Sequence, residues 1–67
     1  MTLLQLIEAL KTPNVNVSVI DADSDTEIIV FKSQGILGVE NDVSARNVRR
    51  WLLLGAQSIS VYLDAAI

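Results

Sequence analysis

The sequence contains neither cysteine nor histidine, and these two absences remove several kinds of chemistry. No disulfide can form, and the usual ligands of zinc are missing. The usual general base and the strongest nucleophile are missing too, so no serine has an imidazole to activate it. The segment "GILG" at residues 35–38 lacks the glycine spacing and the lysine of a phosphate-binding loop. We therefore expect a protein that is not an enzyme and that has no metal and no cofactor.

The sequence also lacks a long apolar run and an excess of basic residues. No run approaches the ~20 residues that a membrane helix needs. The first residues carry Gln5 and Glu8 and lack the basic start of a secretion signal. The net charge of −3 argues against general nucleic-acid binding, whose affinity comes largely from neutralised phosphates. We expect a cytoplasmic protein with no membrane contact, and the absence of cysteine fits a reducing compartment.

The chain is rich in aliphatic residues. Its 67 residues are 51% hydrophobic with only 4% aromatic residues, and they predict a single domain, 1–67. A domain of this size buries only about 60% of its unfolded surface. Because disulfides and zinc are excluded, self-association is one of the few remaining means of support. We therefore predict a homo-oligomer.

Residues 2–11 are predicted to form an amphipathic helix. Thr2 and Gln5 make a capping-box pattern at its start, and Pro13 disfavours helical geometry at Thr12, which ends it. Apolar residues recur at the spacing of one helical face. They are Leu3, Leu6, Ile7 and Leu10.

Two strands are predicted next, joined as a hairpin. Residues 14–20 alternate strictly, with valines on one face and polar residues on the other, which indicates a strand with one buried side. Residues 26–32, "TEIIVFK", are apolar on both faces, so this strand is predicted to be central or covered on both sides.

The turn between these strands carries Asp21, Asp23 and Asp25 in the alternating pattern of a calcium loop. Such a loop needs glycine at its sixth position and glutamate at its twelfth, but Thr26 and Lys32 occupy them. Aspartate and serine also bond backbone amides in turns. We therefore interpret this segment as a structural turn without an ion.

The second half of the chain contains one segment, residues 44–54, that fits two interpretations. Residues 33–47 are predicted to form a connecting segment with one helical turn near 41–45. Residues 58–64 alternate between apolar and polar, which predicts a strand with Tyr62 outward. Residues 44–54 fit a second helix capped by Ser44, or a strand paired with 58–64. The pattern alone leans slightly to helix.

Read as "LLQLIEAL", "VSVIDADSDTEIIVF" and "RNVRRWLLLGAQSISVYLD", the chain resembles a loose group of short phage- and prophage-encoded proteins. The anchors of the resemblance are Asp21, Val48, Trp51, Val61 and Leu63. It implies strand geometry for residues 48–54. The expected fold is thus α+β, with an N-terminal helix packed on a small antiparallel sheet of two hairpins, although 44–54 could instead be a second helix. The group also implies the cytoplasm of a bacterial host.

The candidate ligand-binding site is the only basic cluster. All three arginines, Arg46, Arg49 and Arg50, precede the only tryptophan, Trp51, and Tyr62 is a plausible companion. Arginine forks suit anions, and indole faces suit bases or guanidinium groups. The alternative is that Arg49 and Arg50 pair with surface acids while Trp51 fills the core. Those acids are Glu40, Asp42 and Asp64.

These observations predict a non-catalytic binding protein. Some small phage proteins block host immunity, either by occupying a host defence protein or by sequestering a signalling nucleotide, so both are candidate partners by analogy of class. A nucleotide site would lie near a subunit junction, because one small domain cannot enclose a usual pocket. On a strand, Arg49 would share a face with Trp51 and would be the arginine that reaches the ligand. The alternative is a structural or assembly protein whose apolar surface serves oligomerisation.

Overall fold

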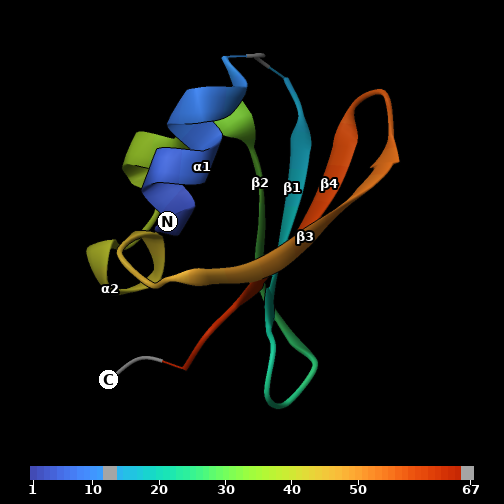
Figure 1. Ribbon diagram of the computed structural model, residues 1–67. Helices are drawn as coiled ribbons and strands as arrows, with labels where there is room; N and C mark the ends of the chain where they lie inside the picture. Colours follow the sequence, from blue (N-terminus) through green and yellow to red (C-terminus); the bar gives the residue numbers. More distant parts are fainter. Residues whose placement is uncertain (12–13, 66–67) are drawn as a thin grey trace.

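The computed structural model describes residues 1–11 and 14–65 and has an N-terminal helix, a four-stranded sheet and two short helical segments (Figure 1). The α+β class is confirmed, and residues 48–55 form a strand. In chain order the elements are α1 (Leu3–Leu10), β1 (Asn16–Asp21), β2 (Thr26–Lys32), the 3₁₀ helix η1 (Ser33–Gly38), α2 (Asn41–Ser44), β3 (Val48–Gly55) and β4 (Ser58–Leu63).

The sheet has the strand order β2-β1-β4-β3. Both predicted hairpins are present, because β1 pairs antiparallel with β2 and β3 pairs antiparallel with β4. The hairpins meet through a parallel pairing of β1 with β4, with Val17 beside Ile59 and Val19 beside Val61. The sheet is therefore mixed, whereas an antiparallel sheet was expected. This pairing brings together the two strands that bury alternate apolar residues on the same face.

The prediction that residues 26–32 form a central or covered strand is wrong. β2 lies at one edge of the sheet, and six of its seven residues are exposed. An apolar run on both faces fits a buried strand, but it equally fits an edge that lacks a neighbour within the monomer. The central positions go to β1 and β4.

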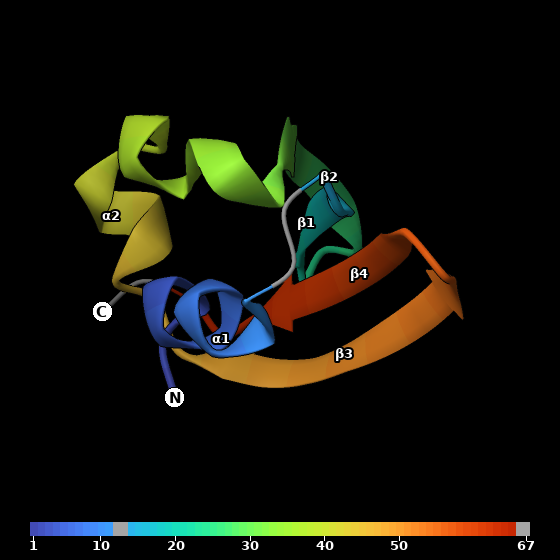
Figure 2. The ribbon, with the colours of Figure 1, turned by 90° about the horizontal axis from the view of Figure 1, so that it is seen from above.

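The three helical segments lie on one side of the curved sheet (Figure 2). The core fills the space between them and the two central strands, and Val17, Val19 and Val61 are fully buried there. The other members of this core are Leu3, Leu6, Ile7, Val15, Ile36, Ile59 and Leu63. No described element covers the opposite face of the sheet, which we call the open face.

The start of α1 follows its sequence pattern. The backbone amide of Gln5 donates to Thr2 Oγ1 at 3.2 Å, and the amide of Thr2 donates to Gln5 Oε1 at 2.9 Å, which confirms the capping box. Lys11 closes the helix in a left-handed conformation, with φ of 53°. The predicted effect of Pro13 on Thr12 falls outside the described residues. Among the helices of the described chain, none has the length and apolar character needed to cross a membrane.

Candidate functional site

The acidic turn between β1 and β2 is held by its own side chains. Asp21 Oδ1 accepts from the backbone amides of Asp23 at 2.9 Å and Ser24 at 3.2 Å. The amide of Asp25, a residue with φ of 59°, donates to the Asp21 carbonyl at 2.8 Å. This confirms the prediction for Asp21, whose carboxylate accepts from two backbone amides of the turn. Within 1–11 and 14–65, no group of three or more acidic residues is arranged to hold a metal ion.

Arg46 joins the ends of the two parallel strands. Its Nη2 lies 3.1 Å from Asp21 Oδ2, and its Nε donates to the Asp64 carbonyl at 2.8 Å. Asp21 ends β1 and Asp64 follows β4, so these groups meet because the strands run in the same direction. Only 12% of the Arg46 side chain is exposed. Arg46 therefore serves the fold and does not present its guanidinium group to a ligand.

The contacts of Asp21 also change the pKa of its carboxyl group. The backbone amides of Ser24 and Asp23, followed by the guanidinium group of Arg46, lower the pKa of the Asp21 carboxyl below the ordinary aspartate value. Each of these donors stabilises the ionised form. Asp21 is thus a charged anchor for both the turn and Arg46.

Arg49 is also occupied by carboxylates, although it is more exposed. Its Nε donates to Asp64 Oδ1 at 2.6 Å and its Nη2 to Asp23 Oδ1 at 3.0 Å. The carboxylates of Asp64 and then Asp23 raise the pKa of the guanidinium group. The expected pairing of Arg49 with Asp64 is confirmed. The register of β3 shifts between Val48 and Arg50, so Arg49 is an extra residue there and does not follow the alternation expected to align it with Trp51.

Arg50 and Tyr62 contact each other on the open face. They are paired across β3 and β4, and the Arg50 guanidinium carbon lies 4.0 Å from the centroid of the Tyr62 ring. This is a cation–π contact. Across the residues that the structure describes, no carboxylate pairs with Arg50. Arg50 therefore keeps donors available for an anion.

The five predicted site residues thus do not form one pocket. Arg46 and Arg49 bind acids at the turn end of the sheet, whereas Arg50 and Tyr62 lie on the open face. Trp51 pairs with Val61 and so belongs to the face that carries the helices, but it is 48% exposed. The interpretation in which Trp51 fills the core is therefore wrong.

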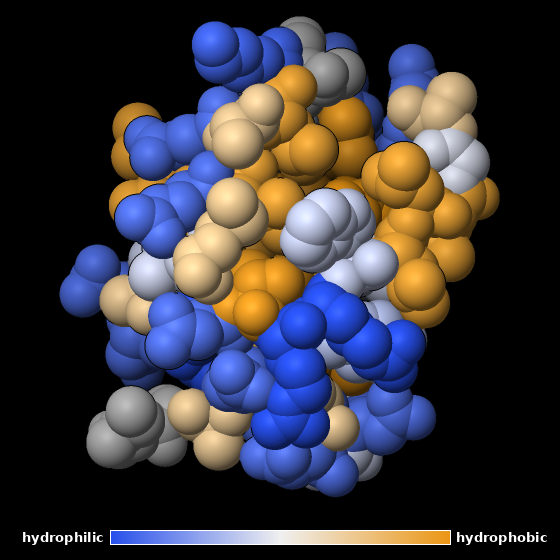
Figure 3. Space-filling view, in the orientation of Figure 1, coloured by the Kyte–Doolittle hydropathy of each residue, from blue (hydrophilic) through white to orange (hydrophobic). Residues whose placement is uncertain are grey.

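The residues that the sequence reasoning missed are the leucines after Trp51. Leu52, Leu53 and Leu54 are 45%, 72% and 64% exposed, although they form a strand next to the central β4. Apolar side chains gather over the end of β3 that leads into β4, above strongly hydrophilic ones (Figure 3). The signal in the sequence was "WLLLG", four large apolar residues before a glycine. We call residues 51–54 the β3 apolar edge.

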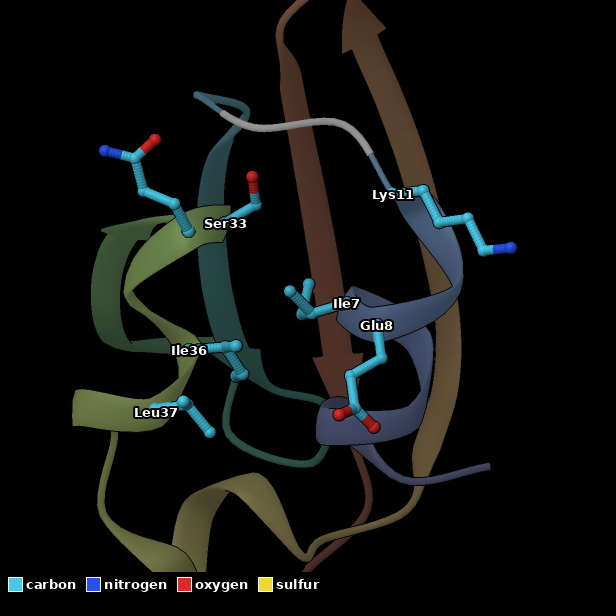
Figure 4. A pocket seen from close by; sticks show the side chains of 7 residues that line it. Ile7, Glu8, Lys11, Ser33, Ile36 and Leu37 are labelled. Atoms are coloured by element: carbon cyan, nitrogen blue, oxygen red, sulfur yellow. The ribbon is translucent and has the colours of Figure 1, made fainter.

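A separate groove of about 380 Å³ lies between α1 and η1 (Figure 4). Ile7 and Ile36 approach each other across it, while Glu8 and Lys11 stand at its α1 rim. The other lining residues are Ser33, Gln34 and Leu37. None of the predicted site residues lies here.

Comparison with known proteins yields no family model, no curated protein and no solved structure that matches this chain.

Proposed function

We propose that this chain is a non-catalytic binding protein that takes an extended segment of a protein partner along β3. The observation that supports this is the β3 apolar edge, an exposed row of large apolar residues on a strand with a neighbour on one side only. Strand addition uses the unpaired backbone groups of such an edge for affinity and the flanking side chains for specificity. Trp51 and Leu53 flank the edge on the helix-bearing face and Leu52 on the open face.

The arginines favour a protein partner over an anion as the main ligand. Arg46 and Arg49 already bind Asp21, Asp23 and Asp64, so an incoming anion would have to displace a carboxylate. A partner that binds the β3 apolar edge displaces no carboxylate. Its binding is favourable because it removes apolar surface from water. Exposed apolar surface rimmed by polar residues is typical of protein interaction sites.

In the phage-type anti-defence hypothesis, the partner is a host defence protein and occupation of its extended segment blocks it. The assembly hypothesis differs in the partner, which would be another copy of the chain or another structural subunit. Both hypotheses require the same edge, so a substitution within it should weaken binding in either case.

Replacing Leu53 by lysine is expected to abolish binding of strand-forming peptides. Seven-residue peptides with alternating apolar positions are selected from a displayed library on immobilised protein and then titrated as synthetic peptides. The readout is the emission of Trp51, the only tryptophan, which should shift to the blue as its exposed half is covered. Leu53→Lys places a charge in the docked interface and should weaken binding at least about tenfold.

The matched control is Leu37→Lys, which makes the same change at a residue that is 88% exposed on η1. This variant should bind like the wild type. Peptides that bind Leu53→Lys as tightly as wild type, or that bind without altering the Trp51 emission, would show that β3 is not the site.

A second candidate function, capture of a cyclic nucleotide, is favoured by Arg50 alone. Its guanidinium group rests on Tyr62 and has no carboxylate partner in the described chain. Calorimetric titration of cyclic di- and trinucleotides should then show heat that Arg50→Ala removes, whereas Arg49→Ala, which breaks pairs with Asp23 and Asp64, should retain it. The absence of heat with the wild-type protein would exclude this function.

A further inference from the structure

β2 forms the other edge of the sheet, and it has charges at its two ends. Glu27 and Lys32 are both exposed, and in the parts of the chain that are described neither has an ion-pair partner. Four apolar residues, 28–31, lie between them, and Ile28, Ile29 and Val30 are 37%, 36% and 52% exposed. An exposed apolar edge strand is a template for another strand.

A bulge in β2 decides which side chains share a face. Val19 pairs with Ile29, but the next residue, Ile20, pairs with Glu27, so Ile28 is an extra residue. In a regular strand, positions 27 and 32 would point to opposite faces, since side chains alternate. Because Ile28 is an extra residue, the bulge brings positions 27 and 32 to the same face. Glu27 and Lys32 both belong to the open face, as their partners Ile20 and Asn16 show.

The same register assigns the residues between them. Val30 pairs with Ser18 and lies on the open face, whereas Ile29 and Phe31 pair with Val19 and Val17 on the helix-bearing face. When Ile28 is skipped, Glu27 and Lys32 lie two positions from Val30 on either side, and Ile29 and Phe31 lie one position from it. An acid at one end, a base at the other and an apolar residue at the centre make β2 self-complementary in an antiparallel pairing.

We propose that β2 pairs antiparallel with β2 of a second copy about a two-fold axis at Val30. Val30 then faces the partner's Val30, Ile29 faces the partner's Phe31, and Glu27 faces the partner's Lys32. The Val30 pair and the Glu27–Lys32 pairs lie on the open face, and the Ile29–Phe31 pairs lie on the helix-bearing face. Glu27 and Lys32 form an ion pair at each end of the interface. The two four-stranded sheets become one sheet of eight strands, with a closed two-fold interface.

Two further features favour this edge for self-pairing. A hollow of about 340 Å³ lies beside β2, lined by Ile28, Ile29, Gly38, Val39, Glu40 and Val43, and a strand added along β2 lies next to it. β3, in contrast, carries Arg49 and Arg50 and no acidic residue, so its own antiparallel pairing gains no charge complementarity. The β2 dimer leaves both β3 edges free at the ends of the combined sheet, so this inference does not depend on the proposed function.

Charge exchange tests the pairing. Sedimentation of the wild type should give twice the 7.3 kDa chain mass. Glu27→Lys and Lys32→Glu each replace attraction by repulsion at both ends and should weaken dimerisation roughly tenfold or more. The double variant, with both residues exchanged, should restore the wild-type affinity. A mixture of the two single variants should form the heterodimer in preference to either homodimer, as native mass spectrometry can measure.

Glu8→Lys and Lys11→Glu make the same charge changes on the exposed side of α1 and serve as matched controls that should dimerise normally. A second test uses the absence of cysteine. Val30→Cys should give a disulfide-linked dimer on oxidation, because paired residues on the axis lie within disulfide distance, whereas Leu52→Cys on the far edge should not.

A wild-type monomer at ~100 μM, where ordinary dimers are formed, would overturn the proposal. So would a Glu27→Lys variant that dimerises as tightly as the wild type, or a double variant that does not recover. Dimerisation accompanied by a shift in Trp51 emission on dilution would also overturn it, because that result assigns the contact to β3. Failure of peptide binding at β3 would leave the β2 dimer intact.

Discussion

Replacing Ile59 by alanine is expected to lower the free energy of unfolding by about 2–4 kcal/mol. Ile59 is 1% exposed and lies on β4, between Val17 of β1 and Leu53 of β3. Alanine removes buried methyl groups and leaves a cavity that the flanking strands cannot fill. Because a domain of this size has a total stability of only about 3–10 kcal/mol, the variant should be close to unfolding. Urea denaturation followed by circular dichroism measures the loss.

The control for this prediction is Leu53→Ala. Leu53 is the neighbour of Ile59 in register but is 72% exposed, so its truncation should cost no more than about 0.5 kcal/mol. Equal losses at the two positions would contradict the placement of β4 at the centre of the sheet.

The second large effect is expected at Arg46. Arg46→Ala should lower the melting temperature by roughly 10 °C, because hydrogen bonds to charged groups are lost at a little-exposed site in a small domain. The Asp21 carboxylate loses its cation and the Asp64 carbonyl loses its donor, so the ends of β1 and β4 are no longer joined. Thermal unfolding followed by circular dichroism gives the shift.

Arg50→Ala removes the same charge from an exposed residue whose guanidinium group contacts the half-buried ring of Tyr62. It should lower the melting temperature by only a few degrees, because an exposed cation–π contact stabilises a fold by about 0.5–1 kcal/mol. A double-mutant cycle of Arg46→Ala with Asp21→Asn should show strong non-additivity. If Arg46→Ala and Arg50→Ala lower the melting temperature equally, Arg46 does not link the ends of β1 and β4.

The sequence pattern predicted α1, β1 and β4, because the residues that define each of them are close together in the chain. The spacing of Leu3, Leu6 and Ile7 and the Thr2–Gln5 pair define α1, and alternation defines β1 and β4. The acidic turn was also predictable, since Asp21 bonds amides only two and three residues away. In each case the interacting groups are close in sequence.

The sheet order was not predictable in the same way. Alternation shows that β1 and β4 each bury one face, but it does not show that they are neighbours or that they run parallel. The apolar run of β2 indicates a central strand, because the pattern of apolar residues shows how hydrophobic each face is and does not show whether another element covers it. Its edge position follows from the tertiary pairing, because among the strands of the described residues only β1 lies beside it.

The candidate site shows the same limit. The clustering of the arginines was visible, but their separate roles depend on Asp21, Asp23 and Asp64, which lie far away in the sequence. The two extra residues in β3, Arg49 and Leu54, also could not be inferred from the alternation that they interrupt.

The most direct test of strand addition to β3 is amide hydrogen exchange with and without a selected peptide. We expect new protection at alternate amides within residues 51–54, because only the backbone groups that point away from β4 gain partners. The β2 amides should be unaffected by the peptide. Protection that appears instead around the groove between α1 and η1, with no change in β3, would show that the peptide does not add to β3.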